Sequence, residues 1–296
     1  MKLFFLILAL AISGTGYEQL PIPVSGKIIR WELGNNELAA RNVDIWIPAD
    51  YSSSRKYAVL YMHDGQMLYD STSSWNKQEW TVDEVMTKLL KEKKIRETIV
   101  VGVFNNGKFR HQEYFPEKPL NKLELAKDIT TNELQGRAMA DEYLSFLVHT
   151  VKPKIDSAFS TKKNRSNTFI AGSSMGGLIS MYAICEYPDV FGGAACLSTH
   201  WIGSLQRNDE SIPKAFNSYL QQHLPDPKHH KIYFDHGDVA LDSLYPKWQA
   251  VVDVTMKAEG YTKKNWMTRA FPGEDHSEKA WAKRLDIPLV FLLRKN

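Results

Sequence analysis

A single serine stands in a setting that could make it a nucleophile. Residues 171–177 read Ala-Gly-Ser-Ser-Met-Gly-Gly, so that Ser174 lies in a Gly-x-Ser-x-Gly pentad. An apolar run at 167–171 precedes the pentad, and a helical pattern follows it directly. A turn this tight leaves no room for side chains at Gly172 or Gly176, and it exposes the serine hydroxyl beyond the end of the strand. The pattern therefore predicts a serine nucleophile.

The chain also offers a base for that serine. A serine hydroxyl is a poor nucleophile until a base removes its proton, and a carboxylate must hold that base in one tautomer. After a turn of this kind the partners follow in the chain order serine, acid, histidine. Nine histidines are present, and His276, the last of them, lies in Pro-Gly-Glu-Asp-His-Ser just past a predicted strand. We therefore expect His276 to be the general base.

Three aspartates compete for the role of the acid. Asp235, Asp238 and Asp242 all lie at or just beyond the end of one predicted strand. Asp235 is expected inside the strand, where its side chain would point into a face of the sheet. The longer reach from Gly237 to Asp242 brings a carboxylate back to His276 more easily than a bend at Asp238. Asp242 is therefore the favoured acid, and Asp238 is the alternative, otherwise expected to cap the loop. A serine–histidine dyad without a working acid stays open.

The tetrahedral intermediate formed when a serine attacks an ester needs backbone N–H donors for its oxyanion. One donor comes from the residue after the nucleophile, here Met175, and the other from the loop after an earlier strand. The run Leu60 to Met67 places a His-Asp-Gly-Gln turn just past an apolar strand. We expect the N–H of Gln66 or of Met67 to be the second donor.

One long polar segment is a candidate wall or lid of the site. Residues 105–128 are polar and aromatic, and they follow a predicted strand at its carboxyl end, where open α/β sheets bind ligands. Several side chains at that edge are expected to contact substrate. They are Arg110 and Tyr114 in the segment, His63 in the His-Asp-Gly turn, and His200 with Trp201 after the strand that follows the serine.

The elements that must position these residues alternate between strand and helix patterns. Two alternating segments at 26–33 and 42–48 predict an antiparallel pair at the edge of the sheet. From residue 57 on, apolar runs alternate with helical spacing, which predicts a mostly parallel sheet with helices on both faces. A long helix is expected from about 131 to 159, and a closing helix ends at 293. Together with the serine turn, this order predicts an α/β-hydrolase fold.

Composition and the N-terminal residues indicate the number of domains and the cellular compartment. The 296 residues, 43% hydrophobic and 24% charged, fit one large α/β domain better than two small ones. Residues 1–16 join a positive end, an apolar run and small residues, as in a secretory signal. We expect a secreted or periplasmic protein whose catalytic domain spans 17–296. The net charge of +3 is spread along the chain, and we interpret the basic clusters at 91–94 and 228–231 as solvated surface.

Cysteine and histidine usage gives no sign of a metal or nucleotide site. Cys185 and Cys196 lie in apolar surroundings and are expected to be buried free thiols, with a disulfide as the alternative. The chain has neither a Cys/His spacing typical of zinc nor a glycine-rich phosphate loop. We expect no metal, no nucleic-acid partner and no membrane anchor once the signal is removed, and the oligomeric state stays open.

Four motifs together resemble those of a known family. They are the His-Asp-Gly-Gln turn, the Gly-Ser-Ser-Met-Gly-Gly turn, the loop from Gly237 to Asp242 and the Pro-Gly-x-x-His-Ser segment. All four are similar to motifs of the Putative esterase family, which includes esterase D, enterochelin esterases, and feruloyl and acetyl-xylan esterase modules. The resemblance spans about Asn42 to the C-terminus. It implies a serine carboxyl-ester hydrolase that needs no metal or organic cofactor.

Within that family the substrate stays open. Ser173 stands where esterase D proteins usually have histidine, which counts against formylglutathione. The acid loop is longer than the Gly-Thr-x-Asp-Ser loop of feruloyl esterase modules, although Asp242-Ser243 echoes its end. We prefer an acylated carbohydrate or plant-wall ester, with a siderophore lactone next.

Two further classes are alternatives. An acyltransferase on the same fold would be favoured if residues 105–128 excluded water. A degenerate domain that only binds would lack the nucleophile or the base, and both are present.

Overall fold

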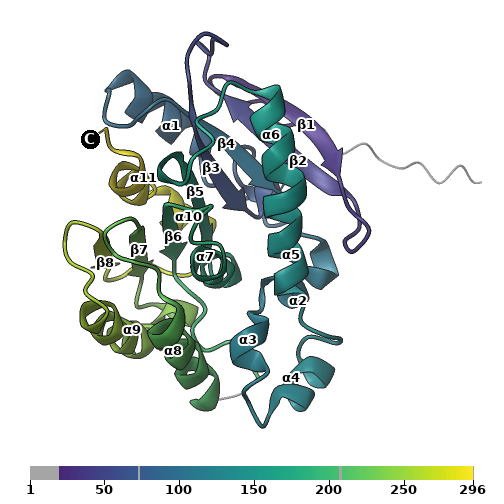
Figure 1. Cartoon of the computed structure of the whole chain (residues 1–296), viewed down its shortest axis with the longest axis vertical. Helices are drawn as coiled ribbons and strands as arrows, with labels where there is room; N and C mark the ends of the chain where they lie inside the picture. The colour runs from purple at the N-terminus through teal and green to yellow at the C-terminus, as the bar shows by residue number, and fades with distance from the viewer. Residues whose placement is uncertain (1–19, 73, 207–208, 296) are drawn as a thin grey trace, which may run out of the picture.

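A single twisted sheet of eight strands organises the part of the chain that the structure describes, residues 20–72, 74–206 and 209–295. In this computed structural model the strand order is β1-β2-β4-β3-β5-β6-β7-β8 (Figure 1). The first two strands pair antiparallel with each other, β2 pairs antiparallel with β4, and all later pairs are parallel. The strands are β1 Lys27–Leu33, β2 Arg41–Ile47, β3 Ala58–His63, β4 Thr98–Val103, β5 Thr168–Ser173, β6 Gly193–Leu197, β7 Lys231–His236 and β8 Trp266–Ala270.

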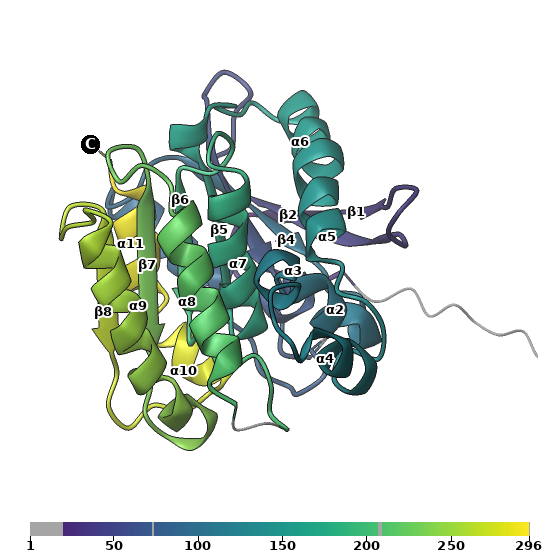
Figure 2. The same ribbon diagram turned by 60° about the horizontal axis from the view of Figure 1, so that its bottom comes forward.

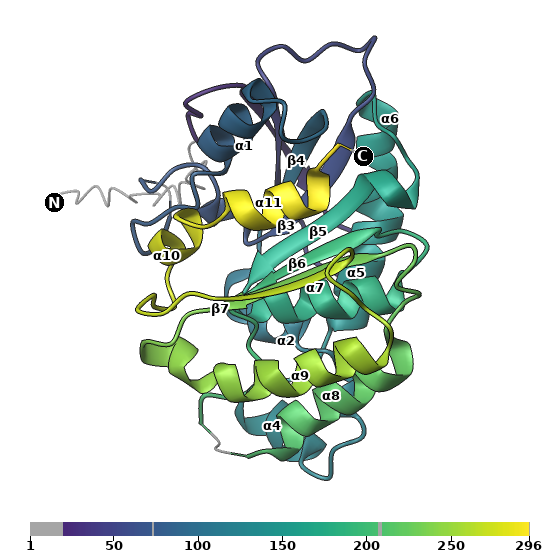
Figure 3. The ribbon, with the colours of Figure 1, turned by 90° about the vertical axis from the view of Figure 1, so that its left-hand side faces the viewer.

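Helices cover both faces of this sheet (Figure 3). One face carries α1 (Val82–Lys91), α10 (Glu278–Ala282) and α11 (Asp286–Leu293). The other carries α5 (Ala140–Phe146), α6 (Lys152–Ala158), α7 (Met175–Glu186), α8 (Ser211–His223) and α9 (Pro246–Ala258). Strand residues alternate between two apolar cores, because successive side chains of a strand point to opposite faces. In β3, Val59 and Tyr61 enter one core while Leu60 and Met62 enter the other.

The central strands are buried on both sides, which explains their continuous apolar sequences. Every residue of β3, β4, β5 and β6 is buried. Parallel strands covered by helices on both faces have this character. The predicted mostly parallel sheet with an antiparallel N-terminal edge and helices on both faces is therefore confirmed.

Three predicted elements differ from the observed ones. Residues 105–128 are not an irregular loop but hold α2 (Arg110–Tyr114), α3 (Glu117–Leu120) and the start of α4 (Ala126–Asn132), which gather beside α5 (Figure 2). The long helix predicted from 131 begins only at Ala140. The chain reverses at Gln135 and Gly136, whose φ angles of 53° and 156° are incompatible with a right-handed helix. The closing helix is divided into α10 and α11.

Two predictions concern the N-terminus and the thiols. The predicted signal, residues 1–16, lies outside the described residues. Among the residues that are described, no helix is both long and apolar enough to cross a bilayer. Cys185 and Cys196 are buried free thiols, and burial raises the pKa of both.

Candidate active site

The serine turn joins β5 to α7 under evident backbone constraint. Ser174 has φ 57° and ψ −122°, an unusual conformation for a residue with a side chain. The Ser174 N–H donates to the carbonyl of Leu197 at 2.9 Å, and the Ser174 carbonyl accepts from the N–H of Leu178 in α7 at 3.0 Å. A Cβ at Gly172 would come within 2.7 Å of the backbone of Gly176. The close approach expected from the pentad is therefore present, and Ser174 lies at the carboxyl edge of the sheet.

The structure brings the predicted base and the favoured acid together. Asp242 lies in a short 3₁₀ helix, η5 (Ala240–Leu244), and its Oδ1 is 2.6 Å from Nδ1 of His276. The carboxylate of Asp242 is fully buried. Burial alone would raise its pKa, but hydrogen bonds from His276, Ser198 and the N–H of Gly237 hold the pKa of Asp242 below its ordinary value. Asp242 is thus an ionised acceptor that fixes the orientation of the imidazole.

The other two aspartates have different partners. Asp235 is buried in the sheet face, where it accepts two hydrogen bonds from the guanidinium of Arg284 at 3.0 and 3.2 Å. Asp238 accepts from the backbone N–H of Gly273 at 2.7 Å. Asp235 therefore neutralises an arginine, and Asp238 ties two loops together, while Asp242 contacts the histidine.

A serine that sequence reasoning missed supports the acid. Ser198 directly follows β6, and its hydroxyl donates to Asp242 Oδ2 at 2.6 Å. The Oγ of Ser198 in turn accepts from the indole N–H of Trp281 at 2.9 Å and from Nη2 of Arg284 at 3.0 Å. Trp281 also packs edge-on against the His276 ring, with centroids 4.9 Å apart. Three segments far apart in sequence therefore hold the acid and the base, and no local pattern could reveal this.

Tyr245 is a second residue that the sequence did not single out. Its hydroxyl is 2.8 Å from Nδ1 of His200, and its ring lies 5.7 Å from that of His276. Burial raises the pKa of Tyr245, and a hydrogen bond with the Ser174 side chain opposes that rise. The phenol is therefore a neutral hydrogen-bonding group next to the serine. Its position three residues after Asp242, in the same loop, is the signal that could have found it.

The candidate backbone donors for an oxyanion differ in whether their N–H groups are already hydrogen-bonded. Met175 begins α7, so its N–H belongs to the first turn, where no helical carbonyl is available. Gln66 and Met67 lie in η1 (Gly65–Met67), directly after β3. The N–H of Met67 donates to the carbonyl of Asp64 at 2.9 Å and is therefore occupied. Gln66 is the better candidate for the second donor.

A cleft of about 700 Å³ opens over Ser174 and His276. Its walls include polar and aromatic side chains from the turn after β3, the 75–80 segment, the 105–110 segment and α10. Among them are Gln66, Trp75, Asn76, Gln78, Trp80, Asn105, Arg110, Glu278 and Trp281.

Of the five expected substrate contacts, one lines the cleft and four are buried. Arg110 lines the cleft, whereas His63, Tyr114, His200 and Trp201 are each at most 3% exposed. Their polar atoms form hydrogen bonds inside the protein. His63 contacts the Tyr143 hydroxyl at 2.7 Å, and the Trp201 indole donates to Gln249 at 2.9 Å. These four side chains are thus part of the packed interior and not of the cleft wall.

Arg110 is held by an aspartate of the His-Asp-Gly turn. Its Nε and Nη2 donate to the two carboxylate oxygens of Asp64 at 2.7 and 2.8 Å, and Asn105 adds a third hydrogen bond at 2.7 Å. Burial alone would raise the pKa of Asp64, but Arg110 holds it below its ordinary value. A Cβ at Gly176 would lie 3.2 Å from Asp64 Oδ2. This ion pair therefore connects α2, η1 and the serine turn.

Three proteins illustrate what the chain is similar to. It is 23% identical over 175 residues to the uncharacterized protein YbbA of Bacillus subtilis, which covers 58% of this chain and 62% of that protein. It is 24% identical over 237 residues to an endo-1,4-beta-xylanase/feruloyl esterase of Xylanibacter ruminicola, covering 78% of this chain and 27% of that protein. The enterobactin esterase of Shigella flexneri superposes with a TM-score of 0.64 at 17% identity, covering 92% of this chain and 60% of the other.

These matches differ in what they establish. The chain spans about 60% of the length of the first curated relatives it matches, so their whole-protein properties do not transfer directly. The structural likeness, at under 25% identity, establishes the α/β-hydrolase fold. A family model described as Putative esterase matches residues 39–291, which include the serine turn, the acid loop and the histidine segment. The chain therefore belongs to the Putative esterase family.

Proposed function

We propose that this protein hydrolyses carboxylic esters through a serine acyl-enzyme. The observation that carries the proposal is the 2.6 Å contact between His276 Nδ1 and the buried carboxylate of Asp242, in a cleft that also contains Ser174. An imidazole whose Nδ1–H is held by a carboxylate presents its other nitrogen as a base. A strained serine turn at the floor of the same cleft supplies the hydroxyl that this base would activate.

The steps of the reaction follow from these positions. Ser174 Oγ attacks the ester carbonyl while His276 takes the hydroxyl proton, and Asp242 stabilises the resulting imidazolium. The N–H groups of Met175 and Gln66 bind the oxyanion. His276 then gives the proton to the leaving alcohol. A water molecule, deprotonated by His276, cleaves the acyl-serine ester and regenerates the enzyme. Such chemistry uses no metal or organic cofactor.

The nucleophile is tested by a matched pair of serine variants. Ser174→Ala should lower kcat for a small aryl acetate by at least ~10³-fold, and a fluorophosphonate probe should no longer label the protein. Ser173→Ala is the control, because Ser173 precedes the nucleophile in the same turn yet ends β5 as a buried residue. It should keep the label. Labelling of Ser174→Ala would overturn the assignment.

The cleft favours an acylated carbohydrate as the substrate. Trp75 lines the cleft and is 81% exposed, which makes its ring available to stack on the apolar face of a sugar. Asn76, Gln78 and Asn105 lie nearby as hydrogen-bonding groups for hydroxyls. The similarity to a xylanase/feruloyl esterase supports the same class. We therefore favour acetyl or feruloyl esters of plant-wall polysaccharides.

A siderophore lactone is the second candidate, supported by the structural likeness to an enterobactin esterase. Ferric catecholate siderophores are anionic, so a cationic cleft would suit them. Among the described residues lining this cleft, Arg110 is the one arginine or lysine, and Asp64 neutralises it. Glu278 adds a negative charge to the same wall. The electrostatics therefore favour the carbohydrate ester.

A substrate comparison with one tryptophan variant separates these candidates. We expect feruloylated or acetylated xylo-oligosaccharides to be turned over with a higher kcat/KM than iron-free or ferric enterobactin. Trp75→Ala should raise KM for the oligosaccharide esters roughly tenfold, on the order of 1.4 kcal/mol, and leave the kinetics on aryl acetate unchanged. Faster turnover of enterobactin, or equal effects on both ester types, would contradict the carbohydrate assignment.

A further inference from the structure

A second large hollow lies at the amino ends of the parallel strands, whereas the catalytic cleft lies at their carboxyl ends. It is a groove of about 910 Å³, lined by segments that precede the parallel strands. The catalytic residues follow the carboxyl ends of β3, β5, β7 and β8, whereas these segments lead into the amino ends of β3 to β8. We call this hollow the basic groove. Its cationic side chains are Lys56, Arg96, Lys162, Arg165, Lys228, Lys231, Lys264 and Lys295.

The charge of the basic groove is strongly unbalanced. Eight lysines and arginines line it together with one acid, Glu97, although the whole chain has a net charge of only +3. Glu97 lies 3.7 Å from Arg55, which is not a groove residue, and among the described residues it forms no ion pair with a cation of the groove. The charged side chains of the groove sum to a net charge of +7, eight cations less one acid, so the rest of the chain is net negative.

Most of these cations have no carboxylate partner. Among the described residues, no ion pair includes any of the six groove lysines, which are Lys56, Lys162, Lys228, Lys231, Lys264 and Lys295. Arg165 lies 3.5 Å from the exposed Asp189. Arg96 donates to carbonyl and amide oxygens, including Ser166 O at 2.9 Å and Arg294 O at 2.9 Å. Burial lowers the pKa of Lys231, and the nearby charges of Arg96 and Arg294 lower it further. This crowding of like charges would be relieved by a bound anion.

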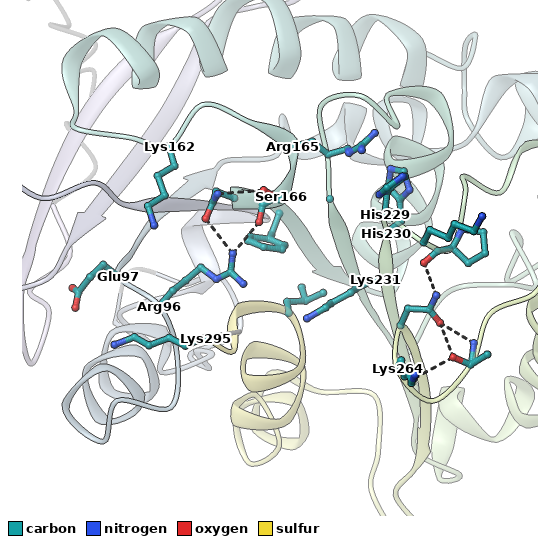
Figure 4. Close-up of a pocket in the computed structure, with 18 of the residues that line it drawn as sticks. Arg96, Glu97, Lys162, Arg165, Ser166, His229, His230, Lys231, Lys264 and Lys295 are labelled. Carbon is teal, nitrogen blue, oxygen red and sulfur yellow. Dashed lines mark hydrogen bonds between the residues drawn. The ribbon is translucent and has the colours of Figure 1, made fainter.

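The cations are distributed along the edge rather than focused on one point. Figure 4 shows Lys162, Arg96, Lys231 and Lys264 reaching the groove from different segments. Apart from Lys295, the groove cations lie before or at the start of β4, β3, β5, β7 and β8, with Lys56 preceding β3, and β6 begins between β5 and β7. Adjacent strands lie about 4.8 Å apart, so six strands span about 24 Å. A row of that length is complementary to an extended polyanion rather than to one small anion.

The other lining groups distinguish between polyanions. Ser166, Asn167, Thr262 and Asn265 contribute hydroxyl and amide groups, which pair with sugar hydroxyls as well as carboxylates. Single-stranded nucleic acids are held largely by stacking of bases on aromatic side chains. The large aromatic residue of the groove, Phe169, is only 2% exposed and cannot serve as a stacking surface. We propose that the basic groove binds an acidic polysaccharide through its carboxylates.

This binding site is independent of the proposed esterase reaction. Its segments lie at the end of the sheet remote from Ser174, so occupancy does not require a working nucleophile. Binding in the basic groove would hold the enzyme on an acidic polymer and leave the catalytic cleft, at the carboxyl ends of the strands, open to substrate. Residues 228–231, which the sequence indicates as solvated surface, are under this proposal part of the binding site.

The test uses the full chain and oligogalacturonate of about ten residues as the probe, with a neutral xylo-oligosaccharide as comparison. Calorimetry at low salt should detect oligogalacturonate binding to the wild type, and raising the salt concentration should weaken it. The triple charge reversal Lys162→Glu, Lys228→Glu and Lys264→Glu should weaken binding at least tenfold. All three lysines are exposed, and kcat/KM on aryl acetate should stay unchanged, which shows that the variant is folded.

A matched control isolates the groove from net charge. Reversal of Lys27, Lys88 and Lys127, which are exposed and do not line the groove, changes the net charge equally and should leave binding within about twofold. Ser174→Ala should bind as the wild type does, so loss of the esterase proposal would not affect this one. Equal weakening by both triple variants would overturn the groove assignment. Tighter binding of a single-stranded DNA oligomer than of oligogalacturonate would overturn the choice of polysaccharide.

Discussion

At the scale of single residues, three aspartates of one short segment have three separate tasks. Asp235 neutralises Arg284, Asp238 fastens the backbone of Gly273, and Asp242 holds His276. The difference arises from where each side chain points. Asp235 still belongs to β7, whereas η5 carries Asp242 back over the edge of the sheet. A carboxylate that touches the imidazole controls its tautomer, and one that caps a loop does not.

Asn substitutions at two of these positions should have unequal effects on catalysis. Asp242→Asn keeps the shape but favours the wrong tautomer of His276, so we expect kcat on aryl acetate to fall by ~10³ to 10⁴-fold, as for the equivalent change in the serine protease from which that magnitude is known. Asp238→Asn should change kcat less than about threefold. Steady-state kinetics of both variants provides the measurement. The reverse ranking would make Asp238 the acid, and two mild effects would indicate a serine–histidine dyad.

At the scale of elements, the Asp64–Arg110 ion pair joins two segments that line the cleft. Asp64 precedes η1, which contains the candidate oxyanion donor, and Arg110 begins α2. The pair joins two segments 46 residues apart, and Asp64 is mostly shielded from water, with 13% of its side chain exposed. Arg110 is therefore a positioning residue for the turn in addition to being a wall of the cleft.

Removal of this arginine should cost stability as well as activity. Arg110→Gln leaves a shielded carboxylate without its cation, and we expect a loss of about 1–3 kcal/mol in the free energy of unfolding, less than for a fully buried pair because 27% of the arginine side chain is exposed. Adding Asp64→Asn should restore part of that loss. Denaturant titration of both single variants and of the double variant measures the coupling.

A surface pair supplies the control for that cycle. Arg137 pairs with Glu142, and 61% of the Arg137 side chain is exposed. Arg137→Gln should therefore cost less than about 1 kcal/mol. If Arg110→Gln is no more destabilising than Arg137→Gln, the ion pair does not hold the cleft together. A fall in activity confined to large esters would then favour a role in substrate contact alone.

At the scale of the whole molecule, buried histidines make stability depend on pH. Burial lowers the pKa of His63 and of His200 from 6.5 to about 3. Below pH 6.5 the unfolded chain takes up protons that the folded chain refuses until about pH 3. The unfolded state therefore binds more protons in this window, and stability falls as the pH falls from 6.5 towards 3. The shielded carboxylates of Asp64 and Asp242, whose pKa values are lowered, act below about pH 4 instead.

Replacement of one buried histidine should flatten this dependence. His63→Asn keeps a polar atom near Tyr143 but removes the titrating ring, so the slope of unfolding free energy against pH between 6 and 5 should decrease by up to about 1.4 kcal/mol per pH unit. Urea unfolding at several pH values in that interval gives the slope. An unchanged slope would show that His63 takes up its proton in the folded state, contrary to its burial.

The sequence by itself determined the fold class and the chemical types of the candidate site. Local spacing revealed the serine turn because steric exclusion at Gly172 is a property of consecutive residues. The alternation of apolar runs and helical patterns predicted the parallel sheet. This signal is also local, because burial of both faces makes each strand continuously apolar. The chain order of serine, acid and histidine then restricted His276 and the three aspartates to one edge.

Only the tertiary structure decided which side chains face the cleft and which face the core. His63, His200 and Trp201 lie at or just beyond strand ends and Tyr114 ends α2, as substrate contacts could, but all four side chains are buried. The hydroxyl of Ser198 meets Asp242, Trp281 and Arg284 from three different segments. Likewise, the cations of the basic groove are scattered from residue 56 to residue 295 and meet only because their strands lie side by side. Side-chain direction and long-range adjacency depend on packing between elements, which no local pattern encodes.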